Sequence, residues 1–256
     1  MKARSPSSST PTRRFESTHV EKKTKRWACA SVLRALRALG EKRKVEGMAR
    51  FGIRAKVAYG VPKPKMDLLA RTIGRDHRLA LELWASGVHD ARILTGMIDE
   101  PDRVTPRQME RWVRDFDNWD VCDGTCCHLF VFAKPVWKKA IAWSRRREEF
   151  AKRAGFALMA YLAYRDQSAS DARYLRLLPP IRREARDERN FVKKAVNWAL
   201  RNIGKRNRRL NRAAIRAAEQ IHKMNSRAAR WIAADALREL RSSAVQKRLR
   251  RKARGK

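Results

Sequence analysis

The chain has 256 residues, with 62 Lys and Arg against 26 Asp and Glu, which gives a formal net charge of +36. This length fits one large domain or two small ones, and 43% hydrophobic content, recurring at helical spacing, argues against a wholly disordered polycation. The uncharged run at 154–164 has 11 residues, well short of the roughly 20 that cross a bilayer, so we expect no transmembrane helix.

The charge points to a polyanionic partner. At a pI of about 11.4, each Lys or Arg placed on a phosphate releases a condensed counterion and strengthens binding, so nucleic acid is the expected partner. A membrane surface would favour one compact amphipathic basic helix, whereas here the charge is spread along the whole chain. The four cysteines, without an apolar signal sequence, indicate a reducing compartment and no disulfide scaffold.

The two ends of the chain are predicted to lie outside the folded domain. Residues 1–26 are rich in Ser, Thr and basic residues, and we expect a disordered basic arm, because such a mixture buries too little apolar surface to fold. An organelle transit peptide is an alternative interpretation, which Glu16 and Glu21 weaken. Residues 241–256 are expected to form a second basic tail, which leaves 27–240 as the folded domain.

Between the ends, apolar residues recur at i, i+3 or i+4 and i+7 in segments divided by Gly, Pro, Ser or Asn, which predicts an all-α fold. The expected helices are 27–39, 44–57, 65–73, 76–86, 89–98, 106–116, 119–131, 135–145, 148–164, 171–186, 190–204, 209–222 and 227–240. A weak internal echo of about 41 residues links 153–158 with 194–200, a period typical of HEAT-like helix pairs. We therefore predict an α-solenoid of stacked antiparallel helix pairs with a concave basic groove, in preference to a closed bundle.

One acidic stretch stands out in this basic chain. Residues 99–123 carry eight acids and four arginines, a net charge of −4, and most of these acids are expected on a face away from nucleic acid. If Asp117 or Asn118 caps a helix that begins at Trp119, then Trp119 and Asp123 share one face near the positive end of the helix dipole. An anion beside an aromatic ring suits a site where positive charge develops. A core tryptophan with a first-turn carboxylate is the structural alternative.

The most basic stretch, residues 182–216, carries 13 Lys and Arg and three acids, a net charge of +10. On its predicted helix, Trp198 lies off the apolar stripe, on a face that it shares with basic side chains. An aromatic ring among cations indicates a surface that grips a phosphodiester chain, although a half-buried Trp among solvated cations gives the same pattern. The basic residues expected to bind DNA phosphates on this face are Lys194, Arg201 and Lys205.

Elsewhere the sequence offers one arginine in an apolar setting and no cofactor motif. Arg153, at the margin of the uncharged run, needs an anionic partner, either an internal carboxylate or a phosphate. Cys122, Cys126, Cys127 and His128 are close in sequence but lack paired C-x2-C spacing, so buried small residues are favoured over a metal site. Gly-rich nucleotide loops, zinc-protease motifs and serine-hydrolase motifs are absent from the sequence.

Three stretches together resemble the AlkD-like DNA alkylation repair family, which are DNA glycosylases built of HEAT-like helical repeats. They are NWDVCD at 118–123, FAKRAGFALMAYLA at 150–163 and NFVKKAVNWALRNIGKRN at 190–207. The likeness runs from about Tyr59 to Leu240, and residues 27–58 do not match the family's N-terminal DNA contacts. Its most specific part is an ordered set of four side chains, which are Trp119, Asp123, Arg153 and Trp198.

The resemblance implies a role for each member of this set. Asp123 would stabilise an oxocarbenium-like deoxyribose and position the attacking water, while Trp119 and Trp198 would flank the lesion. Arg153 would hold the DNA backbone. The resemblance also implies action without flipping of the base into a pocket, unlike the usual glycosylase.

We therefore predict a monofunctional DNA glycosylase that hydrolyses the N-glycosidic bond of cationic N3- or N7-alkylated purines, such as 3-methyladenine and 7-methylguanine, in duplex DNA. No metal or cofactor is expected, because a cationic base leaves as a neutral molecule without a general acid. A lyase would need a desolvated lysine, for which Lys193 and Lys194 are the candidates. We expect a monomer, located in the cytoplasm with the nucleoid.

Two other functional classes remain open from the sequence. The main alternative is a non-catalytic helical-repeat protein that binds DNA or structured RNA through charge. A protein-interaction scaffold of HEAT-like repeats is the third possibility, which the charge of +36 disfavours.

Overall fold

The computed structural model describes residues 27–254, so the predicted N-terminal arm at 1–26 lies outside the described residues. The α-helices are α1 (Cys29–Leu39), α2 (Lys42–Met48), α3 (Lys63–Ile73), α4 (His77–Ala85), α5 (His89–Ile98), α6 (Pro106–Arg114), α7 (Trp119–His128), α8 (Val136–Trp143), α9 (Glu149–Arg165), α10 (Asp171–Leu175), α11 (Leu178–Glu184), α12 (Asn190–Gly204), α13 (Arg208–His222), α14 (Arg227–Arg241) and α15 (Ser243–Arg254). The 3-10 turns are η1 (Ala49–Phe51), η2 (Pro101–Arg103) and η3 (Phe130–Phe132).

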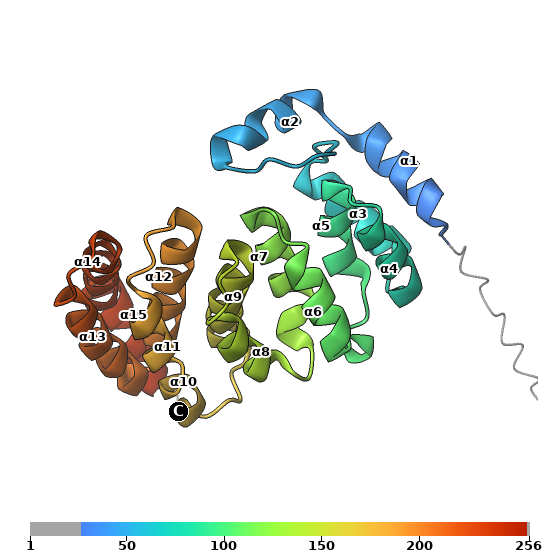
Figure 1. Ribbon diagram of the computed structural model, residues 1–256. Helices are drawn as coiled ribbons and strands as arrows, with labels where there is room; N and C mark the ends of the chain where they lie inside the picture. Colours follow the sequence, from blue (N-terminus) through green and yellow to red (C-terminus); the bar gives the residue numbers. More distant parts are fainter. Residues whose placement is uncertain (1–26, 255–256) are drawn as a thin grey trace, which may run out of the picture.

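The helices stack in a curved row from α1 at one end to α14 at the other, with α2 lying across one edge (Figure 1). Helix α7 packs against α5 and α9, α9 packs against α8 and α12, and α12 packs against α13 and α14. Over the part of the chain that is described there is no β-strand, and none of the helices there is long and apolar enough to span a membrane. The predicted all-α solenoid of stacked helix pairs is confirmed.

The core consists of two clusters of buried side chains along the row, and α9 belongs to the larger one. The apolar side chains of α7, α8, α9, α12, α13 and α14 join in one cluster, and those of α1, α3, α4 and α5 form a second. Helix α9 is buried almost all round, as the uncharged run at 154–164 suggests. Gly155 allows α8 to approach closely, because a Cβ at this position would lie 2.5 Å from the backbone nitrogen of Ser144.

Two predicted helices are broken in the structure. The segment 44–57 is α2 followed by η1, and the helix ends at Gly52, whose φ of 76° is in the left-handed region that favours glycine. The segment 171–186 divides into α10 and α11, because Pro179 and Pro180 lack the N–H groups that a continuous helix would need there. The first break matters for function, since it directs the chain across the start of α7.

Within the stretch 241–256, which the sequence predicts to be a basic tail, Ser243–Arg254 form a packed helix. Helix α15 lies against α13 and α14, and its apolar side chains Val245 and Leu249 are 7% and 1% exposed. The basic residues around them hide this amphipathic pattern in the sequence, because charge dominates the composition of the segment. The folded unit therefore reaches beyond residue 240.

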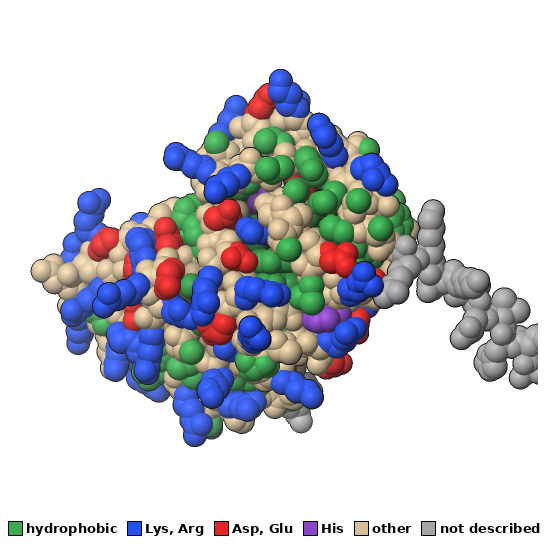
Figure 2. Space-filling view, turned by 45° about the vertical axis from the view of Figure 1, so that its right-hand side comes forward, with side chains coloured by type: hydrophobic (Ala, Val, Ile, Leu, Met, Phe, Trp, Pro, Cys, Tyr) green, Lys and Arg blue, Asp and Glu red, His purple; other side chains and the backbone are tan. Residues whose placement is uncertain are grey.

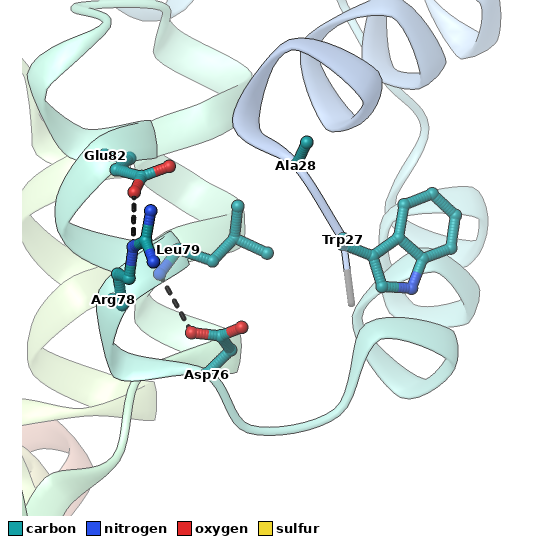
Figure 3. A pocket seen from close by; sticks show the side chains of 6 residues that line it. All are labelled: Trp27, Ala28, Asp76, Arg78, Leu79 and Glu82. Atoms are coloured by element: carbon teal, nitrogen blue, oxygen red, sulfur yellow. Dashed lines mark hydrogen bonds and ion pairs between the residues drawn. The ribbon is translucent and has the colours of Figure 1, made fainter. Parts of the chain in front are cut away.

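The described chain starts at a small hollow between α1 and α4, with a volume of about 210 Å³ (Figure 3). Asp76 caps α4 by accepting a hydrogen bond from the backbone N–H of Leu79 at 2.9 Å, and Arg78 donates to Glu82 at 2.9 Å. Trp27 lies on the opposite wall. The charged side chains that line the hollow are therefore paired within the protein, and we assign the hollow a structural role.

Candidate functional site

The site begins at the N-terminus of α7. The side-chain oxygen of Asn118 accepts hydrogen bonds from the backbone N–H groups of Asp120 and Val121, both at 3.0 Å. This cap starts the helix at Trp119, as predicted. Trp119 and Asp123 therefore lie one turn apart on the same face of α7.

Asp123 and Arg153 form a bidentate ion pair between α7 and α9. The Nε of Arg153 donates to one carboxylate oxygen at 2.9 Å and its Nη2 donates to the other at 2.6 Å. Its Nη1 donates to the backbone oxygen of Phe191, the second residue of α12, at 2.7 Å. Arg153 thus ties together the starts of three helices, and its partner within the protein is an internal carboxylate.

Burial and pairing act in opposite directions on this carboxylate. The side chains of Asp123 and Arg153 are 16% and 9% exposed, and burial raises the pKa of Asp123 while the Arg153 guanidinium opposes the rise. Although burial favours the neutral form of Arg153 too, the adjacent carboxylate raises its pKa overall. Both oxygens of the Asp123 carboxylate accept from the guanidinium, which is the geometry of a charge-assisted ion pair and places an anion at the site.

Trp119 forms the wall between two cavities. One cavity, of about 430 Å³, is lined by Asp123 and the rest of the exposed face of α7, together with residues of α2 and α3. The other, of about 470 Å³, is lined by Arg153, Lys194, Phe191 and the turn at 49–52. Trp119 lines both cavities, Asp123 lines the first, and its partner Arg153 lines the second.

Trp198 does not line the cavity that contains Asp123 but packs behind Tyr161, which does. It is half-buried, and its ring packs edge-on against Tyr161 with 4.8 Å between ring centroids and an interplanar angle of 82°. Tyr161 itself lines the cavity, and burial, followed by the charge of Asp123, raises the pKa of its hydroxyl. Tyr161 is a site residue that the sequence analysis missed, although its position two turns after Arg153 on α9 was a signal for it.

The three predicted phosphate contacts on α12 differ in their surroundings. Lys194 is exposed, has no ion-pair partner among residues 27–254, and lines the same cavity as Arg153. Lys205 pairs with Glu239 of α14 at 2.7 Å. Arg201 pairs with Glu239 as well and with Asp235 at 3.4 Å. Lys194 belongs to the site, whereas Arg201 and Lys205 hold α12 to α14.

The cysteines near the site are packing residues. The thiols of Cys122 and Cys126 are buried and point to backbone oxygens of α9, at 3.5 and 3.9 Å. Cys127 accepts a hydrogen bond from Arg165 at 3.4 Å. In the described range, no group of three or more His, Cys, Asp and Glu side chains is arranged to hold a metal ion.

Lys and Arg side chains are spread over most of the face shown in Figure 2, with acidic side chains among them. Acidic residues near the site have internal partners. Asp120 accepts from His89 at 3.2 Å, and Asp90 accepts from the backbone N–H groups of Tyr59 and Val61 at 2.6 and 2.7 Å. These contacts fix the positions of the two carboxylates beside the cavity.

The fold matches that of a solved structure described as "a new family of proteins related to the HEAT-like repeat DNA glycosylases with affinity for branched DNA structures". The match has a TM-score of 0.70 and 20% sequence identity, and it covers 87% of this chain and 96% of that chain. No curated protein sequence matches the chain. At this identity, the structural likeness establishes the HEAT-like repeat fold.

The family described as "DNA alkylation repair enzyme" matches residues 32–240, a span that contains every helix of the site and ends just before α15. Because the match covers most of the chain, this protein belongs to the DNA alkylation repair enzyme family.

Proposed function

We propose that the protein is a monofunctional DNA glycosylase that hydrolyses the N-glycosidic bond of cationic N3- or N7-alkylated purines in duplex DNA. The observation that carries the proposal is the Asp123 carboxylate, whose two oxygens both accept from Arg153 and which lines a cavity together with Trp119. A fixed anion of this kind lowers the energy of a transition state in which positive charge develops.

Beyond this carboxylate, the proposed hydrolysis requires few other groups of the protein. Alkylation at N3 or N7 makes the purine cationic, so the bond to C1′ breaks with its electron pair moving to the base, which leaves neutral. Positive charge then develops on the deoxyribose, where Asp123 stabilises it, and water adds to C1′ and loses a proton to the carboxylate or to solvent. No general acid is required for the leaving group.

The aromatic side chains give the site its shape. Trp119 would contact the lesion nucleotide directly, since it lines the cavity of Asp123, and its π face attracts a cationic sugar. Trp198 would act through Tyr161, against which its ring packs. We propose that these rings support the lesion while it stays in the duplex, without flipping of the base.

Hydrolysis is favoured over a lyase reaction by the surroundings of the two candidate lysines. A Schiff-base nucleophile needs a lysine with a lowered pKa, usually in a desolvated pocket. Lys194 is exposed, the ammonium of Lys193 lies over the ring of Trp231 at 5.4 Å, and neither lysine lines the cavity that contains Asp123.

A non-catalytic DNA-binding protein is the second candidate function. It is favoured by the charge of +36 and by the affinity for branched DNA that is reported for the similar solved structure. The two candidate functions are distinguished by measuring the release of free 7-methylguanine from a duplex by excess protein. Release above the uncatalysed rate supports the glycosylase, and tight binding without release supports the binding protein.

A further inference from the structure

A large cavity lies far from Asp123, between the start of α13 and the end of α15. Its volume is about 710 Å³, and it sits near the C-terminal end of the described chain, at the edge opposite α2 (Figure 1). Its lining residues are Gln167, Asp171, Arg206, Asn207, Arg208, Arg209, Arg212, Leu249, Lys252 and Ala253. We refer to it as the α13–α15 groove.

The groove is strongly cationic. Five of its lining side chains are Lys or Arg and only Asp171 is acidic, and the Asp171 carboxylate accepts a hydrogen bond from Asn207 at 2.7 Å. Arg208, Arg209 and Arg212 are exposed and have no ion pair within residues 27–254. Because Arg212 lies one turn of α13 from both Arg208 and Arg209, the charges of the three repel one another unless an anion lies between them.

One cation of the groove is fixed in place before any ligand arrives. Arg206 donates to the backbone oxygen of Ala163 at 2.9 Å, and its guanidinium stacks over the ring of Tyr174 at 4.0 Å. A guanidinium held in this way loses little conformational entropy when it binds an anion. The buried side chain of Leu249 anchors the opposite wall, α15, to the core.

The groove is also separate from the site around Asp123. Phe191, which accepts from Arg153, and Arg206 lie at opposite ends of α12, and 15 residues of helix span roughly 22 Å. Helix α15 lies beyond residues 32–240, the part that matches the DNA alkylation repair enzyme family. One wall of the groove is therefore an addition to the part of the chain that the family shares.

We propose that the α13–α15 groove binds the phosphate backbone of duplex DNA that extends away from the nucleotide at Asp123. The inference rests on the proposed action on DNA. Three unpaired arginines on one helical face match a row of phosphates, and each such contact adds a counterion-release contribution to affinity. At 3.4 Å per base pair, the DNA must extend at least about 6 base pairs from the lesion to reach the groove.

The test compares two triple variants by salt-dependent DNA binding. One carries Arg208→Gln, Arg209→Gln and Arg212→Gln. The matched control carries Gln at three exposed arginines of one other helix, α6, which have no ion pair in the described chain; they are Arg107, Arg111 and Arg114. Affinities are measured for a 7-base-pair duplex and a 31-base-pair duplex of the same central sequence, roughly 3 and 15 base pairs on each side of the centre.

On the long duplex, the α13 variant is expected to lose about 2 to 3 units of the log–log salt slope relative to the α6 control, and on the short duplex the two should agree. Equal slopes on the long duplex, or an equal loss on both duplexes, would overturn the proposal. A larger loss with a 31-base-pair RNA duplex than with DNA would assign the groove to RNA instead. Single-turnover base release at saturating protein reports separately on Asp123, so failure of the proposed glycosylase would not be mistaken for failure of the groove.

Discussion

The indole N–H of Trp119 donates a hydrogen bond to the backbone oxygen of Phe51 at 2.8 Å, across 68 residues of sequence. The next residue, Gly52, comes so close to α12 that a Cβ there would lie 2.6 Å from the ring of Phe191. The turn at 49–52 therefore meets the first residue of α7 and the start of α12 together. The orientation of Trp119 depends on this N-terminal turn as well as on α7.

Replacing Trp119 by Phe keeps an aromatic ring and removes the hydrogen bond to Phe51. We expect single-turnover base release to fall roughly 2- to 10-fold, the equivalent of one hydrogen bond of about 0.5–1.5 kcal/mol. Trp119→Ala should lose more, because the ring is lost too. Equal rates for the Phe variant and the unmodified protein would show that the contact with Phe51 does not position the indole.

Arg153 controls the pH range in which Asp123 is ionised. Since the guanidinium lowers the pKa of a carboxyl that burial raises, Arg153→Gln should raise that pKa further. In the proposed mechanism base release requires the ionised carboxylate, so we expect activity to be lost as the pH falls through the pKa of Asp123, and the variant should lose it at higher pH than the unmodified protein. The comparison uses pH profiles of single-turnover release, corrected for spontaneous depurination.

Removal of one member of a buried ion pair also costs stability, about 3–5 kcal/mol. Arg153→Lys serves as a second variant, because it keeps the charge and loses the bidentate geometry. The pH profile of base release by Arg153→Lys should lie between those of the unmodified protein and Arg153→Gln. If both variants fold and neither pH profile shifts, Arg153 does not control the ionisation of Asp123.

Lys194 and Arg201 lie on the same helix, and only Lys194 lacks an ion pair among the described residues. Lys194→Gln is expected to reduce the log–log salt slope of DNA binding by about 1 unit. Arg201→Gln should leave the slope nearly unchanged and lower the stability, since it leaves Glu239 and Asp235 with fewer partners. A smaller slope for Arg201→Gln together with an unchanged slope for Lys194→Gln would show that Arg201, and not Lys194, contacts a phosphate.

Local parts of the site could be predicted from the sequence. The Asn118 cap and the spacing of Trp119 and Asp123 depend on neighbours within one turn of helix, and the start of α7 at Trp119 is confirmed. The all-α solenoid also follows from local periodicity. These features need no knowledge of contacts between distant segments.

Contacts between helices distant in sequence could not be predicted in the same way. The sequence shows that Arg201 and Lys205 share a face with Trp198, but only the packing of α14 shows that Glu239 lies opposite them. The sequence could not show whether Arg153 binds a carboxylate or a phosphate, because its partner Asp123 is 30 residues away. The turn at 49–52 was assigned to a helix, since the periodicity there does not reveal the break at Gly52.

Asp187 connects the loop before α12 to α9, and it gives a stability prediction with a defined pH range. Burial acts to raise its pKa, but bonds from Arg189 and Lys152 lower it to about 2, from a usual value of 3.8. A depressed pKa in the folded state stabilises the protein above about pH 4, and this stabilisation is lost as the pH falls towards 2.

The free energy of unfolding, measured by urea between pH 5 and pH 2.5, should therefore depend less on pH in Asp187→Asn than in the unmodified protein. The expected difference is on the order of 1–2 kcal/mol. Asp102→Asn is a matched control, because Asp102 is exposed. An Asp187 variant with the pH dependence of the unmodified protein would contradict the assigned role of this loop.

The central claim is that the Asp123 carboxylate drives base release. Single-turnover release of 7-methylguanine and 3-methyladenine from duplex DNA is measured for the unmodified protein, Asp123→Asn and the charge-matched control Asp102→Asn, with duplex affinity and thermal unfolding determined in parallel. We predict that Asp123→Asn loses at least about 100-fold in rate, keeps its affinity within a few-fold and stays folded, while the control is unchanged. Release by a folded Asp123→Asn variant at the rate of the unmodified protein would contradict the account.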